Sequence, residues 1–347
     1  MLCQIKTCIN SEKTAIIQRI ICLHYPHIFS VTAPATRHIE GFVLAIIAAV
    51  GFSAKAIFVK LAYQTTSIDP ITLLSLRMAF SVPAFLFVAF SRRDRHPPLK
   101  PHDWLLICAL GLIGYYLSSL LDFMGLQYLS AGLERLILFL YPTITVLLAA
   151  IWLKHPITRT HVVAIALSYS GIALAFVNEV PQGNHNLWLG AALVFASTLA
   201  YSIYLTGAGH AITRIGSIRF TALSMLVAST ATLLQFSLTH HASALRQPMH
   251  VYELALGMAA FSTILPVFAQ SAAIRLIGPG RAALIGSIGP VSTIFMAWLI
   301  LHENVSLTQL FGSALVLTGV WLIGRKQRIT KPDSLFQGSR CAAGQEE

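Results

Sequence analysis

The stretch GLERLILFLYPTITVLLAAIWLKHPITRTHVVAIALSYSG, residues 132–171, has a related second copy later in the chain. Its second copy, GRAALIGSIGPVSTIFMAWLILHENVSLTQLFGSALVLTG at residues 280–319, aligns with it without a gap at a shift of 148 positions. Pro142 then falls on Pro290, and identical residues also meet at Gly132, Leu136, Ile137, Thr145, Ala149, Leu153, Thr160, Ala166, Leu167, Gly171 and Leu174. An ungapped match of this length indicates an internal duplication, around which the fold is organised.

The composition of the chain is that of a protein built for lipid. Its 347 residues are 56% hydrophobic and 11% charged, with a mean hydropathy of +0.71. The net charge of +11 sits in short clusters between apolar runs, which argues against a nucleic-acid binder. The five cysteines show neither metal-ligand nor CxxC spacing, so we expect no disulfide framework, no metal site and no cofactor.

Ten apolar runs are long enough to cross a bilayer core, which takes about 20 helical residues. They lie at residues 41–63, 70–90, 104–126, 131–153, 158–177, 188–207, 220–239, 252–273, 282–301 and 307–324. They lack the period-2 alternation of a β-barrel, and only helices and closed barrels satisfy backbone polar groups in lipid. We therefore predict an all-α integral membrane protein with ten transmembrane helices.

The loops between these runs differ strongly in charge. The side that holds the N-terminus carries 19 of the 24 Lys and Arg residues, the other side carries one, and four lie inside the runs. By the positive-inside rule both termini are cytoplasmic, and we expect a multi-pass protein of the bacterial inner membrane. Because each copy of the duplication holds five spans, an odd number, the second copy is inverted relative to the first. Two inverted five-helix repeats are typical of transporters that alternate access around a midplane site.

This topology divides the chain into four parts. Residues 41–177 form the first repeat and residues 188–324 the second. Residues 1–40 mix charges and proline into a moderately apolar stretch, which fits a cytoplasmic extension better than a signal peptide. Residues 325–347 form a cytoplasmic tail that is too short for a soluble output domain.

A charge inside a membrane span costs about 2.5–3.5 kcal/mol on insertion scales, so it marks a functional site by default. The outer half of the first repeat holds Lys55, Lys60, Arg77, Asp122, Glu134 and Arg135. We expect five of these residues to face one another or a wet cavity and to bind substrate. Lys60 is the exception, because it lies close enough to its helix end for its ammonium to reach the headgroups. Structural alternatives stay open. Asp122 could simply neutralise Arg77 or Lys55, and Glu134 could complement the dipole at the start of its helix while Arg135 reaches the surface.

Uncharged polar residues are expected to extend this site. Asp122 shifted by 148 is Gln270, so the same place is polar in both copies. Tyr115, Tyr201 and Tyr204 offer aromatic walls with hydroxyl groups, although packing or an interface belt explains tyrosines in membrane helices equally well.

Prolines at positions 83, 142, 266 and 290 are expected to interrupt four of the spans, because proline removes a backbone donor. The equivalent pair, Pro142 and Pro290, are our candidates for hinges next to the site. The small residues Gly111, Gly114, Gly171, Gly312 and Gly319 are expected to allow close helix packing.

Several segments resemble the EamA-type permeases of the drug/metabolite transporter superfamily. They are GFVLAIIAAVGFSAKAIFVKLAY at the start of the first span, LSLRMAF around Arg77, GLQYLSAGLERLILFLYPT, and IGSIGPVSTIFMAWLILHENVSLTQLFGSALVLTGV in the second half. The resemblance covers roughly residues 41–325. It implies ten helices in two inverted repeats, a central cavity lined mainly by helices one, three, four, six, eight and nine, and export of amino acids or other metabolites.

The chain departs from the family pattern at one turn. The family usually places an acidic residue after the fourth and ninth helices, followed by Ser or Thr. Glu303 fits this pattern, with Ser306 after it. The equivalent first-half residue is His155, so the two turns are not expected to work alike.

These observations predict a secondary transporter rather than an enzyme. We expect it to export a small polar metabolite, an amino acid or another carboxylate-bearing compound, with Lys55, Arg77 and Asp122 as the charged site and Asp122 or Glu134 as the proton carrier. Lipid-linked or nucleotide-sugar cargo would suit the same charges. An integral-membrane enzyme acting on a lipid phosphate is the weaker alternative, because the acidic residues are scattered. The expected partners are the substrate and the bilayer, and homodimerisation is left open.

Overall fold

The computed structural model describes residues 34–91, 98–152, 154, 156–177 and 186–326. The chain divides into two units, residues 1–40 and 41–347. Of the first unit only residues 34–40 are described, and they are already helical, so the first helix begins before the expected boundary at residue 41. The expected extension before residue 34, the tail after residue 326 and His155 lie outside the described residues.

In the described part of the chain every regular element is a helix. The first half holds α2 (Pro34–Thr65), α3 (Pro70–Ser91), α4 (Pro101–Gly111), the π-helix η2 (Leu112–Leu117), α5 (Ser118–Gly125), α6 (Ala131–Leu138), α7 (Tyr141–Trp152) and α8 (Arg159–Phe176). The second half holds α9 (Leu187–Ile215), α10 (Ser217–Thr239), the 3-10 helix η4 (Ala242–Leu245), α11 (Met249–Ala259), the π-helix η5 (Ala260–Ile264), α12 (Leu265–Ile277), α13 (Pro279–Gly286), α14 (Ile288–Ile300) and α15 (Leu307–Lys326).

The helix bounds repeat with the same period as the sequence. A shift of 148 residues carries α4 onto α11 and α6 onto α13 with identical bounds. It also carries the π-helix η2 onto η5, a feature that the sequence reading missed. The duplication seen in residues 132–171 therefore extends over the helices of both halves.

The apolar helices suit a bilayer. Within the residues that the structure describes, eight helices are long and apolar enough to cross a membrane, and two shorter apolar helices, Ile288–Ile300 and Leu307–Ile323, follow them. The chain is therefore a multi-pass membrane protein.

The prolines shape these helices unequally. The fourth predicted span breaks into α6 and α7 just before Pro142, and the ninth breaks at Ser287, between α13 and α14, just before Pro290. Proline clashes with the preceding turn but is tolerated in the first turn of a new helix, which is where both of these residues lie. Pro266 follows the π-helix η5. Pro83 was expected to interrupt its span, but α3 runs through it.

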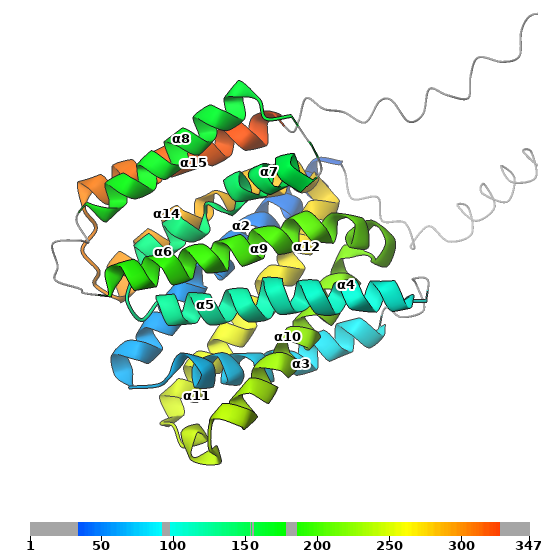
Figure 1. Ribbon diagram of the computed structural model, residues 1–347, viewed down its shortest axis with the longest axis vertical. Coiled ribbons are helices and arrows are strands. Elements are labelled where there is room, and N and C mark those ends of the chain that lie inside the picture. The colour runs from blue at the N-terminus through cyan, green and yellow to red at the C-terminus, as the bar shows by residue number, and fades with distance from the viewer. Residues whose placement is uncertain (1–33, 92–97, 153, 155, 178–185, 327–347) are drawn as a thin grey trace, which may run out of the picture. The chain divides into compact units, whose positions relative to one another are not determined.

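Related helices of the two halves pack in pairs. The contacts join α8 with α15 and α3 with α10, and α5 also packs on α9 (Figure 1). The largest apolar cluster includes four fully buried side chains of α3, namely Leu73, Leu74, Met78 and Phe85. Phe123 of α5 belongs to the same cluster, so α3 and α5, which carry Arg77 and Asp122, share a rigid core.

Glycines allow the α8–α15 pair to approach closely, as the sequence predicted. A β-carbon on Gly171 would lie 2.5 Å from the carbonyl oxygen of Gly312, and one on Gly319 would meet the Ser168 side chain. In lipid, helices associate through such close backbone approach.

Replacing Gly312 by valine should separate α8 from α15. We expect it to lower the free energy of unfolding by about 1–3 kcal/mol, the usual cost of overpacking, because the backbone of α8 has no room to move away cheaply. Thermal unfolding of the purified protein measures the loss. Gly209→Ala is the matched control: its β-carbon would meet nothing within 4 Å, and we expect no loss of stability.

Candidate functional site

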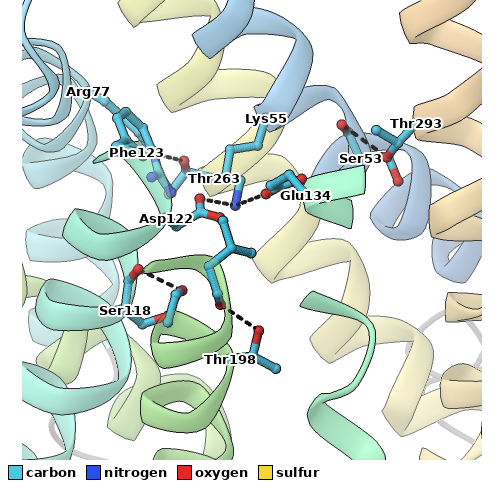
Figure 2. Close-up of polar contacts among 12 residues, drawn as sticks. Ser53, Lys55, Arg77, Ser118, Asp122, Phe123, Glu134, Thr198, Thr263 and Thr293 are labelled. Carbon is cyan, nitrogen blue, oxygen red and sulfur yellow. Dashed lines mark hydrogen bonds and ion pairs between the residues drawn. The ribbon is translucent and has the colours of Figure 1, made fainter. Parts of the chain in front are cut away.

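Three charged side chains from three helices meet inside the protein. The Lys55 ammonium of α2 lies 2.5 Å from Asp122 Oδ2 of α5 and 3.3 Å from Glu134 Oε1 of α6 (Figure 2). The exposed fractions of the three side chains are 16%, 2% and 0%. The structure therefore brings together three residues that the sequence singled out separately.

Local structure fixes the two carboxylates on a helical hairpin. Asp122 lies near the end of α5, and the Leu126 backbone N–H donates to its carbonyl oxygen at 2.9 Å. Ser130 caps α6 by accepting from the Leu133 N–H at 3.3 Å, which sets Glu134 in the first turn of that helix. Asp122 and Glu134 thus lie on either side of the α5–α6 turn, and the Lys55 ammonium contacts both carboxylates.

This cluster has more acceptor capacity than donors. Within the described residues, Asp122 Oδ1 and both carboxylate oxygens of Glu134 are buried without a hydrogen bond, although Glu134 is ion-paired with Lys55. One ammonium thus serves two carboxylates. Buried charge without full pairing is costly, so the arrangement suits a proton, or a donor group of a ligand, that completes it.

Arg77 lies beside this cluster but has different partners. Its Nε donates to Thr263 Oγ1 of η5 at 2.9 Å, and its guanidinium carbon lies 5.5 Å from the centre of the Phe123 ring (Figure 2). In the described part of the chain Arg77 Nη1 is buried and makes no hydrogen bond. The sequence reading missed Thr263 and Phe123. The shift of 148 carries Tyr115, which it did name, onto Thr263.

Arg135 points to the break in the ninth span. A β-carbon on Gly289 would lie 2.8 Å from Arg135 Nη2, so the guanidinium lies directly against the backbone of α14 at Gly289. Arg135 interacts electrostatically with Glu134 and with Tyr201. It thereby connects the charged cluster to the helix break near Pro290 and to a group of tyrosines.

The predicted tyrosines contact one another. Tyr115 and Tyr204 place their hydroxyl oxygens 3.1 Å apart and their ring centres 4.8 Å apart. Tyr201 stacks on Tyr204 at 5.8 Å, and Tyr141 meets Tyr201 edge to face at 5.6 Å. Tyr141 was missed, although it directly precedes Pro142 at the break in the fourth span.

The last predicted site residue stands apart. Gln270 is half-buried on α12. Among the residues described, no hydrogen bond or ion pair joins it to the charged side chains. The structure therefore joins Lys55, Asp122 and Glu134 in one cluster and the tyrosines in another, and it leaves the equivalence of Gln270 with Asp122 as a prediction.

Comparison with known proteins agrees with this architecture. The model of the EamA-like transporter family matches the chain twice, at residues 39–177 and 188–325. The uncharacterized transporter YcbK of Bacillus subtilis (strain 168) is 31% identical over 292 residues, which cover 81% of this chain and 92% of that protein. An uncharacterized transporter of Archaeoglobus fulgidus is 26% identical over 270 residues, covering 78% and 94% of the two chains.

Solved structures show the same fold. One crystal structure matches with a TM-score of 0.60 and 14% identity, covering 84% of this chain and 99% of its own. The duplicated helices, the buried charges in apolar spans and the two family matches lead to one conclusion. The chain belongs to the EamA-like transporter family and is a membrane transporter.

Proposed function

We propose that the protein is a secondary transporter that exports a small polar metabolite carrying a carboxylate, such as an amino acid, by alternating access. The observation that carries this proposal is the buried cluster of Lys55, Asp122 and Glu134, with Arg77 and Arg135 beside it. Ionisable groups this deep in apolar helices mark a substrate or ion pathway.

The transport architecture is ten helices in two inverted five-helix repeats, residues 41–177 and 188–324. The shared helix bounds and the paired π-helices support two repeats of one design. An odd number of spans per repeat inverts the second one. The Lys and Arg count supports the proposed orientation, in which both termini are cytoplasmic and the protein lies in a bacterial inner membrane.

The charge of the site favours an anionic substrate group. Lys55, Arg77 and Arg135 supply three positive charges against the two carboxylates of Asp122 and Glu134. A single carboxylate on the substrate would make this group neutral, and a guanidinium can bind a carboxylate through two parallel hydrogen bonds. Arg77 Nη1 and Arg135 Nε, which are buried without a hydrogen bond in the described structure, are the available donors.

Replacing Arg77 by alanine tests this assignment. We expect cells that express the intact chain to accumulate a carboxylate-bearing metabolite in the medium, and cells that express Arg77→Ala to fall to the level of empty vector. Arg77→Lys keeps the charge but loses the planar fork, so it should retain part of the export. Mass spectrometry of medium and cytoplasm measures both.

Arg246→Ala is the matched control, because Arg246 is exposed after η4 and should not affect export. Identical profiles for intact chain, Arg77→Ala and empty vector would contradict the small-carboxylate proposal. Accumulation of a lipid-linked compound or a nucleotide sugar instead would assign the same fold to the alternative cargo.

A further inference from the structure

Two charged residues hold the hairpin that carries the site acids. Lys60 Nζ of α2 donates to the carbonyl oxygens of Leu129 at 2.9 Å and Leu126 at 3.4 Å. Both carboxylate oxygens of Glu303 accept from the Ala131 backbone N–H at 3.1 Å. Lys60 therefore does not reach toward headgroups as its sequence position suggested, but binds the backbone of the α5–α6 turn.

Each charge matches the helix end that it contacts. Leu126 is the C-cap of α5, where unpaired carbonyl groups leave a partial negative charge, and Lys60 brings a cation there. Ala131 is the first residue of α6, where unpaired N–H groups leave a partial positive charge, and Glu303 brings an anion. Asp122 and Glu134 lie within one turn of these two ends, so the two contacts fix the spacing of the carboxylates that share Lys55.

The two contacts differ in where they come from. Lys60 lies on α2, the helix that also carries Lys55, so this contact stays within the first repeat. Glu303 belongs to the connection between α14 and α15 in the second repeat. The side-chain amide of Gln309 on α15 lies next to Gly132, one residue further along α6, where a β-carbon would meet it. The contact of Glu303 with α6 thus joins the two repeats at one end of the site.

The backbone next to Glu303 is unusual. His302 has a φ of 55°, and Lys154, which is 148 residues earlier, has a φ of 53°. Residues other than glycine rarely adopt this left-handed conformation, and they do so mostly where the surrounding structure requires it. The left-handed residue therefore recurs at the equivalent position of both repeats, but the acidic residue that follows it in the sequence is present in the second repeat alone, since the first has His155.

We propose that Lys60 and Glu303 are positioning residues of an outer gate. Lys60 keeps the α5–α6 hairpin with α2, while the contact of Glu303 with Ala131 is the releasable one that closes the site toward the outside. This inference rests on the proposed function, because the orientation proposed there puts the α5–α6 turn and the connection between α14 and α15 on the outer side of the membrane. Loss of the Glu303 contact shifts the population toward the outward-open state without removing any group that touches the substrate.

A labelling experiment tests the gate without any knowledge of the substrate. The reporter is Ser118→Cys in a full-length chain whose own cysteines are serine, since Ser118 is 8% exposed and lies one turn deeper than Asp122. A membrane-impermeant maleimide added outside intact cells should label this cysteine about tenfold faster in Glu303→Ala, a factor typical of coupled conformational equilibria. Glu303→Gln keeps an oxygen that accepts the Ala131 N–H, but more weakly than a carboxylate does, so its labelling rate should lie between those of the parent and Glu303→Ala.

Glu253→Ala is the matched control, because Glu253 is an exposed acid in the first turns of α11, at the same end of the helices. Equal labelling rates in Glu303→Ala, Glu253→Ala and the parent would overturn the gate, as would faster labelling from the cytoplasmic side alone. Either result leaves export itself to be decided by the Arg77→Ala comparison, so the two proposals fail separately.

Hydrogen exchange of the purified proteins gives a second readout if the alanine variant is poorly produced. The comparison is made at a pH where Glu303 of the parent is ionised. The backbone N–H groups of residues 131–134 should exchange faster in Glu303→Gln than in the parent, because a neutral side-chain amide accepts the Ala131 N–H more weakly than a carboxylate does. Exchange at residues 131–134 that is unchanged in Glu303→Gln would contradict the proposed role of the carboxylate.

Discussion

Lys55→Ala is expected to lower the free energy of unfolding by about 3–5 kcal/mol and to abolish export, because it leaves buried carboxylates without their counter-ion. Asp122 and Glu134 are 2% and 0% exposed, so both carboxylates are poorly solvated once the ammonium is removed. Thermal unfolding of the purified protein in detergent measures the first effect, and metabolite export from cells measures the second.

A compensating variant separates charge from packing. Adding Asp122→Asn to Lys55→Ala removes one of the unpaired charges and should recover part of the lost stability while export stays absent. Arg246→Ala, which removes an exposed cation, should change neither quantity. If Lys55→Ala unfolded at the same temperature as the parent, the ion pairs with Asp122 and Glu134 would not be holding the site together.

Glu134→Gln is expected to uncouple export from the proton gradient. Glu134 is fully buried, both its oxygens lack a hydrogen bond in the described structure, and glutamine has nearly the same shape but cannot take up a proton. In liposomes that hold the full chain, an imposed pH gradient should change the initial rate by about tenfold for the parent and leave the variant unchanged. The ratio of rates with and without a protonophore measures this coupling.

The neighbouring acid supplies the comparison. If Asp122→Asn loses the response and Glu134→Gln keeps it, the proton carrier is Asp122, which lies closer to Lys55. Glu253→Gln, at an exposed acid of α11, should retain the full response. A gradient response that persisted in both site variants would contradict proton coupling through this cluster.

Much of the fold could be predicted from the sequence because lipid imposes strong constraints. Apolar runs of about 20 residues and the shift that joins Pro142 to Pro290 located the helices and both breaks. The π-helices η2 and η5 could not be predicted, since no residue type in LIGYYL or AFSTI demands the wider turn. Pro83 is the opposite case: the sequence predicted a break in the span, but α3 continues through this residue.

The sequence allowed the ion pairs of the site to be predicted, but not its hydrogen bonds to neutral groups. Opposite charges in apolar helices must find one another, so the meeting of Lys55 with Asp122 and Glu134 follows from their presence. The Arg77–Thr263 hydrogen bond does not follow, because its partner is a neutral hydroxyl 186 residues away. The contact of Glu303 with Ala131 was equally hidden, since a backbone N–H leaves no mark in the sequence.

Export from liposomes that contain the purified full-length chain tests the central claim most directly. The liposomes are loaded with a polar metabolite extract, and the compounds that leave are identified by mass spectrometry. We predict that a carboxylate-bearing metabolite leaves liposomes with the intact chain, and that it stays inside protein-free liposomes and liposomes with Arg77→Ala. The absence of any compound that leaves faster than from protein-free liposomes, or release of a compound without a carboxylate, would contradict the account.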